Sequence, residues 1–141
     1  MDKFLDKLYG TEEEFEFFLE GILKASVRLV NRTDELREEL DGLEKETQIF
    51  ISDEGSGFWF EHTGDGLIYQ KGICKDAPLK VWLPKEALIS ILKQDVYASD
   101  LYMKGKIQLR GDIDQAIRLK NFLYNFTKYL RNIKSISSKK D

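Results

Sequence analysis

Residues 47–70, TQIFISDEGSGFWFEHTGDGLIYQ, decide the fold of this chain. They contain three runs rich in β-branched and aromatic residues, at positions 47–52, 58–62 and 67–70. Turn residues separate the runs, and the second turn contains Asp65-Gly66, a pair that supplies the positive φ angles of a tight hairpin. The pattern predicts three antiparallel strands joined in sequence order, which is a meander.

Downstream of the meander, strand and helix patterns alternate. Pro84 ends a strand and suits the first turn of a helix. Gly111 ends a later strand, and Asp112 is placed to cap the helix that follows. The predicted elements are a strand over residues 79–83, a helix over 85–93, a strand over 103–110 and a helix over about 113–131.

Upstream of the meander the pattern is helical. Thr11 and Glu14 have the spacing of a capping box, and apolar residues then recur every three or four positions to about residue 31. A short second helix follows and ends near Gly42. The order of elements predicts an α+β domain, with a five-stranded, mainly antiparallel sheet and helices on one face.

The alternation along the strands assigns side chains to the two faces of this sheet. The helix-covered face receives Ile49, Ile51, Phe58, Phe60, Val81, Leu83, Ile107 and Leu109. Phe50, Trp59 and Trp82 then point the other way. These three aromatics form either a dimer or docking patch, or a surface that the N-terminal segment or a loop covers.

Length and composition indicate one globular domain. The chain has 141 residues, of which 42% are hydrophobic and 33% charged. We assign residues 1–134 to the domain and expect a disordered tail at 135–141. The net charge of −3 hides an asymmetry, since residues 1–46 hold fourteen acids and seven bases whereas residues 101–141 hold three and ten. The basic part can pair with the acidic part, or form a patch for anionic groups.

The sequence favours a cytoplasmic protein. No apolar run approaches the roughly 20 residues of a transmembrane helix, and charges at positions 2–7 lead us to expect no signal peptide. Cys74 is the only cysteine, which excludes an intrachain disulfide. We expect no nucleic-acid partner, because aromatic and basic residues are not interleaved as such a surface requires.

Residues for catalysis are scarce. His62 is the only histidine, and neither it nor Cys74 lies in a nucleophile motif or a metal-binding spacing. Asp112 and Asp114 lie at the start of a predicted helix, where a cap and a partner for the helix dipole explain them without a catalytic role. We therefore expect no enzyme activity, no metal and no cofactor.

Apolar residues occupy more than half the circumference of the last predicted helix, which is more than packing on one sheet face needs. The excess, centred on Phe122, Phe126 and Tyr129, must meet the first helix, a dimer partner or an apolar ligand.

A stretch near the fifth strand resembles the sterol carrier protein, or non-specific lipid transfer, domain family. The matching positions are Gly105, Lys106, Ile107, Leu109, Gly111, Asp112, Ala116 and Leu119. The order of the predicted elements also resembles this family over about residues 12–130. The resemblance implies a sheet and helices that enclose an apolar tunnel, and binding of sterols, acyl chains or phospholipids without catalytic residues.

Two functional hypotheses follow. The first is a carrier for an elongated apolar ligand such as a lipid, fatty acyl chain, isoprenoid or sterol, with transient contact to a membrane surface. Its predicted lining is Phe18, Ile22, Phe60, Leu88, Leu92, Leu101, Met103, Phe122 and Phe126, and its predicted headgroup residues are Lys104, Lys106 and Arg110. The alternative is an interaction or scaffold module that forms a homodimer or docks a partner protein.

Overall fold

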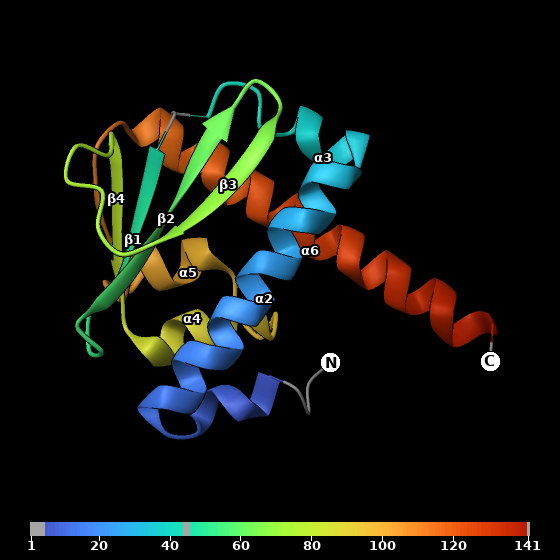
Figure 1. Cartoon of the computed structure of the whole chain (residues 1–141), viewed down its shortest axis with the longest axis horizontal. Coiled ribbons are helices and arrows are strands. Elements are labelled where there is room, and N and C mark those ends of the chain that lie inside the picture. Colours follow the sequence, from blue (N-terminus) through green and yellow to red (C-terminus); the bar gives the residue numbers. More distant parts are fainter. Residues whose placement is uncertain (1–4, 44–45, 141) are drawn as a thin grey trace.

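The computed structural model describes the backbone of residues 5–43 and 46–140, and within these ranges the side chains up to residue 132. A sheet lies in front of a group of helices, and one long helix extends beyond them (Figure 1). In chain order the elements are η1 (Asp6–Tyr9), α2 (Glu12–Arg32), α3 (Asp34–Glu38), β1 (Glu46–Ile51), β2 (Ser56–Thr63), β3 (Gly66–Lys71), β4 (Leu79–Leu83), α4 (Lys85–Leu92), α5 (Ala98–Met103), β5 (Gln108–Arg110) and α6 (Ile113–Lys140).

The five strands have the spatial order β3-β2-β1-β4-β5. The pairs β1–β2, β2–β3 and β4–β5 are antiparallel, whereas β1 and β4 are parallel. The predicted meander and the mainly antiparallel sheet are therefore confirmed. The parallel pair arises because the connection after β3 carries the chain from that edge across β2 and β1 to β4 (Figure 1).

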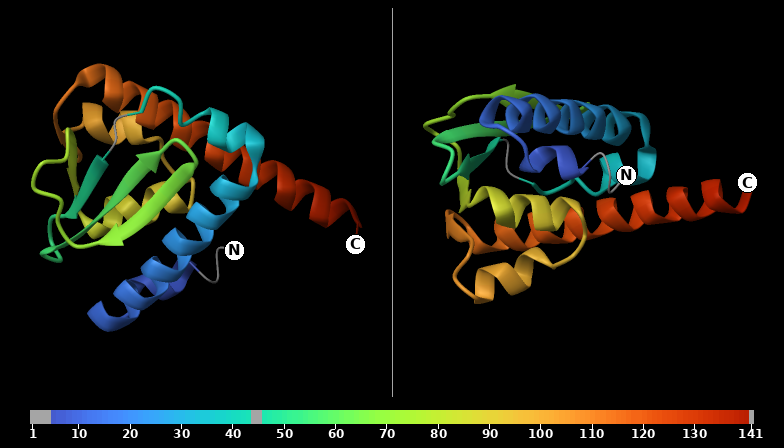
Figure 2. Two further views of the ribbon diagram at one scale, coloured as in Figure 1. Left: turned by 45° about the horizontal axis from the view of Figure 1, so that its top comes forward. Right: turned by 90° about the horizontal axis from the view of Figure 1, so that it is seen from below.

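Helices α4, α5 and α6 lie on one side of the sheet, and α2 runs along the β3 edge (Figure 2). The capping box at the start of α2 is confirmed, since Thr11 Oγ1 accepts from the Glu14 N–H at 3.2 Å and the Thr11 N–H donates back to the Glu14 carboxylate. At the other end of α2, the Asn31 side chain donates to the Leu67 carbonyl and accepts from the Leu67 N–H, both at 2.8 Å. These two bonds join the helix to the edge strand.

The strand register confirms the predicted faces. Ile49 lies opposite Phe58 on β2 and Val81 on β4, on the side that the helices cover. Phe50 lies opposite Trp82 on the other side, and the two rings stack at 5.0 Å.

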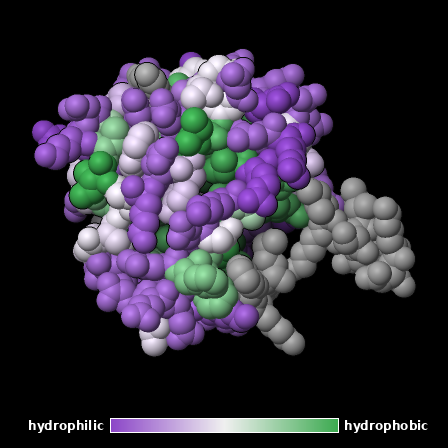
Figure 3. Space-filling view, in the orientation of Figure 1, coloured by the Kyte–Doolittle hydropathy of each residue, from purple (hydrophilic) through white to green (hydrophobic). Residues whose placement is uncertain are grey.

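The outward face of the sheet is partly covered by the connection after β3. Gln48 is fully buried there. Its side-chain amide donates to the carbonyls of Phe58 and Gly72, and its side-chain carbonyl accepts from the Cys74 N–H. Phe50, Trp59 and Trp82 are half-buried. Hydrophilic and apolar residues are interspersed over this face (Figure 3).

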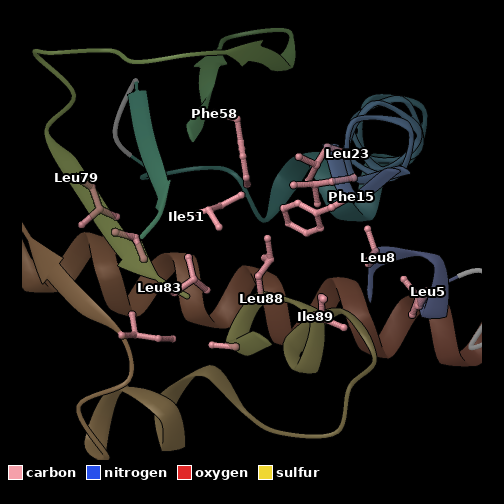
Figure 4. Close-up of a cluster of buried hydrophobic side chains, with 14 residues drawn as sticks. Leu5, Leu8, Phe15, Leu23, Ile51, Phe58, Leu79, Leu83, Leu88 and Ile89 are labelled. Carbon is pink, nitrogen blue, oxygen red and sulfur yellow. The ribbon is translucent and has the colours of Figure 1, made fainter. Parts of the chain in front are cut away.

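The buried apolar residues form two clusters. The first cluster fills the space between the sheet, α2 and α4 (Figure 4), and consists of Leu5, Leu8, Phe15, Leu19, Leu23, Ile51, Phe58, Leu79, Val81, Leu83, Ala87, Leu88, Ile89 and Ile107. The second cluster joins α2, α3 and α6, and consists of Val30, Leu36, Leu40 and Phe122.

The predicted fifth strand in the last third of the chain is wrong. Residues 103–110 are not one strand, because α5 occupies Ala98–Met103 and β5 covers only Gln108–Arg110. Gly105, with a φ of +77°, turns the chain between them. The last helix continues to Lys140, beyond its predicted end at about residue 131, and neither Gly nor Pro interrupts it. Asp141 lies outside the described residues.

Candidate functional site

The described residues contain no group of three or more His, Cys, Asp and Glu side chains that could hold a metal ion. His62 lies opposite Leu67, near the β2–β3 turn. Cys74 is tied through its backbone to Gln48, which lies opposite Trp59 nearer the other end of β2. His62 therefore lies near one end of β2, whereas Cys74 is bonded to a residue opposite the middle of that strand.

The chemically distinctive feature of the chain is a fringe of half-buried apolar residues around the first cluster. We call the following residues the fringe: Phe18, Ile22, Ile49, Phe60, Tyr69, Ile91, Leu92, Ala98, Leu101, Leu109, Ala116 and Leu119. They come from strands β1, β2, β3 and β5 and from helices α2, α4, α5 and α6. Large apolar groups that are only partly covered can rearrange around a ligand more easily than groups packed on every side.

Aromatic rings line the sheet side of the fringe. Phe58 and Phe60 meet edge to face with ring centres 5.6 Å apart, and the Tyr69 ring lies 6.0 Å from each. Burial raises the pKa of the Tyr69 hydroxyl, and the carboxylates of Glu20 and Glu16 on α2 raise it further. This hydroxyl stays protonated at neutral pH, so the aromatic wall carries no charge.

A hollow of about 290 Å³ lies between α6 and the segment that joins α4 to α5. Ile91 and Ala98 belong both to its wall and to the fringe. Leu123 and Tyr124 line it from α6, and the Tyr124 ring lies 6.3 Å from that of Tyr97. The hollow is slightly smaller than the roughly 300–1,000 Å³ that is typical of small-molecule pockets.

The end of α4 shapes one side of this hollow. Gln94 has a φ of +63°, and the N–H groups of Gln94 and Asp95 bond to the carbonyls of Ile91 and Ser90. This is a Schellman motif, which stops the helix and redirects the chain. The Gln94 side chain in turn accepts a hydrogen bond from the Arg131 guanidinium on α6, so it holds the two walls together.

A second hollow, of about 470 Å³, lies between α3 and α6. Four carboxylates line it, from Glu35, Glu38, Glu39 and Asp41, together with Arg118 and Asn121. Such a lining is unsuited to an apolar ligand, because burying unpaired charges beside hydrocarbon is costly.

The structure divides the predicted lining into four groups. Leu88 is in the first cluster, and Phe18, Ile22, Phe60, Leu92 and Leu101 are in the fringe. Phe122 and Phe126 belong instead to the second cluster and its surroundings, where their rings stack at 6.2 Å. Met103 does not share a site with the others, because it ends α5 and its side chain is 82% exposed.

The predicted headgroup residues do not line the hollow. Lys104 and Lys106 are exposed in the turn between α5 and β5. Arg110 lies opposite Lys80, in the row of side chains that points away from the helices. The cations at the hollow are Lys120 and Arg131 of α6. Sequence reasoning missed them because it weighed α6 by its apolar residues, although Lys120, Tyr124 and Arg131 share one face at helical spacing.

Comparison with known families identifies the family of this chain. The family model of the SCP-2 sterol transfer family matches residues 24–124, which is more than half of the chain. This chain belongs to the SCP-2 sterol transfer family. The family resemblance seen in the sequence is therefore confirmed. Comparison with curated protein sequences finds no match.

Solved structures show that this SCP-2 family chain has the family's fold. It is similar to a "UbiJ-SCP2 Ubiquinone synthesis protein", with a TM-score of 0.61, 15% identity and coverage of 76% of this chain and 88% of that one. Apo sterol carrier protein 2 from Yarrowia lipolytica gives a TM-score of 0.60 at 17% identity, with coverage of 77% and 88%. The α+β prediction is confirmed by these similarities.

A part of a much larger enzyme is also similar. The sec-alkylsulfatase Pisa1 from Pseudomonas sp. matches 62% of this SCP-2 family chain with a TM-score of 0.52 and 18% identity. The match spans only 13% of the sulfatase. It shows the fold of that region and carries no conclusion about sulfatase activity.

The structure explains why the matching motif has glycine at position 111. Gly111 has a φ of +132°, and a Cβ at this position would collide with the carbonyl oxygen of Pro78. Only glycine allows β5 to leave the sheet this close to the chain before β4. The motif near the fifth strand thus specifies the path into α6, and it says little about the ligand.

Proposed function

We propose that this chain binds an elongated apolar ligand, such as a fatty acyl chain or another lipid-like molecule, and carries it without chemical change. The observation that carries the proposal is the junction of the hollow with the fringe at Ile91 and Ala98. A ligand that enters there meets partly covered side chains next, rather than the closed first cluster. The hollow alone is small, so a long chain gains its remaining space by displacing fringe side chains such as Leu92.

Apolar burial supplies the affinity in this proposal. Each methylene that leaves water contributes about 0.8 kcal/mol before the costs of ordering the ligand and the side chains. Lys120 and Arg131 at the hollow are suited to an anionic headgroup. The family's description as a sterol transfer family and a similar structure described as palmitated SCP2L2, from Aedes aegypti, support a lipid as the ligand class.

The proposed role is non-catalytic and cytoplasmic. Its only chemistry is desolvation, and His62 and Cys74 have no part in it. We assign no cofactor. If the chain catalyses a reaction, His62→Ala or Cys74→Ala should reduce that activity. We expect neither variant to alter ligand binding.

Native mass spectrometry of the freshly purified protein, followed by solvent extraction and lipid analysis, tests the proposal. We expect the wild-type protein to retain a lipid-like species. Ser99→Phe fills the hollow from its α5 wall and should abolish retention. Ser52→Phe, which places the same side chain in the exposed turn after β1, is the matched control and should retain the lipid.

Three results would contradict the carrier function. One is an empty wild-type protein that also fails to bind added palmitate. Another is equal retention by the Ser99→Phe and Ser52→Phe variants. The third is a ligand-free protein that sediments as a discrete dimer, which would favour the interaction module instead.

A further inference from the structure

Exposed apolar side chains concentrate on one side of the molecule. Among the described residues, seven of the eleven exposed large hydrophobic side chains lie between positions 96 and 124: Val96, Tyr97, Tyr102, Met103, Ile113, Ile117 and Tyr124. Figure 2 shows α5 alongside the first half of α6, on the side of α6 that is turned away from the sheet. These seven residues lie in the connection before α5, at the end of α5 and in the first half of α6, and the Tyr97 and Tyr124 rings lie 6.3 Å apart across the two segments.

On α6 these apolar residues form a stripe with basic ones. At about 100° per residue, Ile113, Ile117, Lys120, Tyr124 and Lys128 fall within one narrow arc, and all five are exposed. We call these five residues the outer stripe. No acidic residue lies in its arc. Asp114 is about 100° away from Ile113 around the helix, and its N–H bonds to the Asp112 carboxylate.

The turn after α5 repeats the combination of apolar and basic groups. Met103 and Tyr102 end α5, and Lys104 and Lys106 follow within three residues. Two backbone hydrogen bonds hold the turn, from the Gly105 N–H to the Tyr102 carbonyl and from the Lys106 N–H to the Leu101 carbonyl. Asp95 and Asp100 are the acidic residues of the connection before α5 and of α5 itself. The basic residues of the face come from the turn after α5 and from the outer stripe.

We propose that the outer face of α5 and α6 docks on the surface of an anionic lipid bilayer. Apolar and aromatic side chains flanked by lysines suit the boundary between headgroups and acyl chains, where rings and methyl groups enter and ammonium groups meet lipid phosphates. The charge complementarity selects an anionic surface over a neutral one.

The docking face is continuous with the ligand hollow. Lys120 and Tyr124 belong to the outer stripe and also line the hollow. In the docked orientation the hollow opens toward the lipid, so an apolar ligand could leave the bilayer without crossing water. This last step rests on the proposed carrier function, whereas the docking itself does not.

Flotation with vesicles tests the electrostatic part of the docking. The vesicles are phosphatidylcholine alone or phosphatidylcholine mixed with phosphatidylglycerol. We expect the wild type to bind only the mixed vesicles, and to be released by added salt. Lys120→Glu with Lys128→Glu should weaken binding at least tenfold, since each lysine near an anionic surface contributes about fivefold. Arg28→Glu with Arg32→Glu, on the exposed side of α2, changes the net charge equally and should have less than about a threefold effect.

A second pair of variants tests the apolar part. Met103→Asp and Ile73→Asp each replace an exposed apolar residue, the first on the docking face and the second on the far connection after β3. We expect Met103→Asp to weaken vesicle binding several-fold and Ile73→Asp to leave it unchanged. Both positions are exposed, so thermal unfolding should show that both variants remain folded.

The outcomes separate docking from ligand binding. Binding of palmitate by the protein is measured without vesicles, and its absence would contradict only the carrier function. Equal vesicle binding by the outer-stripe and α2 double variants would overturn the docking surface, as would no binding to mixed vesicles. A concentration-dependent dimer that Ile117→Asp disperses, without vesicle binding, would assign the outer stripe to a second copy of the chain and also overturn the proposal.

Discussion

Helix α4 carries two isoleucines with different surroundings, and they represent two regions of the molecule. Ile89 is fully buried in the first cluster with Phe15 and Leu8, whereas Ile91, half a turn away, is half-buried and lines the hollow. The first region is closed on every side. The second adjoins open space and side chains that can move. The difference separates residues that hold the fold together from residues that make room for a ligand.

The largest expected effect comes from breaking the closed region. Phe15 has no exposed surface, and Phe15→Ala should lower the free energy of unfolding by about 3–5 kcal/mol. Leu92→Ala in the fringe should cost less, about 1–2 kcal/mol, because the side chain is mostly but not fully buried. Urea denaturation measures both. Similar losses for the two variants would show that the fringe is as well packed as the first cluster.

The next largest effect is the rise in Tm that a bound ligand causes. A ligand that binds only the folded chain raises its stability by about 2.7 kcal/mol at a free concentration of 100 Kd. We expect palmitate to raise the Tm of the wild type and of Ser52→Phe by several degrees, and to leave that of Ser99→Phe unchanged. A shift in Ser99→Phe equal to that of Ser52→Phe would mean that the ligand binds elsewhere.

Much of the fold could be predicted from the sequence because its signals are local. Two-residue alternation and turn chemistry place the meander, and the spacing of Thr11 and Glu14 places the start of α2. The boundary of β5 was harder to predict. Residues 98–110 satisfy a strand pattern in part, but Gly105 follows α5 with a φ of +77° and stops that helix, with bonds from the Gly105 and Lys106 N–H groups to the Tyr102 and Leu101 carbonyls.

The site was less predictable, because it depends on contacts between distant segments. Phe122 was expected in the ligand lining, but the packing of α3 places it in the second cluster with Leu36 and Leu40. The excess of apolar residues on α6, centred on Phe122, Phe126 and Tyr129, meets the first helix at Leu29 and Val30, which is one of the three outcomes expected. Phe122 and Phe126 pack inward, whereas Ile113, Ile117 and Tyr124 remain exposed.

A smaller effect should change stability without touching the ligand site. Thr11→Ala removes the hydroxyl that accepts the Glu14 N–H, and should lower the free energy of unfolding by about 1 kcal/mol. Palmitate affinity should not change, because α2 begins beside the closed region. Glu14→Ala provides a double-mutant cycle, in which losses that simply add would show that the two side chains do not act together.

The smallest effect concerns pH. Burial and the carboxylates of Glu20 and Glu16 raise the pKa of Tyr69 above its ordinary value of 10.0. The folded chain therefore holds this proton more tightly than the unfolded chain, and the associated stability is present below pH 10 and lost as the pH rises above it. We expect the stability of Tyr69→Phe to fall less steeply above pH 10 than that of the wild type. Parallel pH profiles would contradict the burial of the hydroxyl.

The most direct test of the account is methyl NMR of selectively labelled isoleucines during titration with palmitate. We expect a large, saturable shift of the Ile91 methyl signal and little change at Ile89, although the two residues lie on the same helix. Comparable shifts of both signals would show that the ligand enters the closed region. No shift at Ile91, with saturation seen only at isoleucines far from the hollow such as Ile73, would contradict the proposed site.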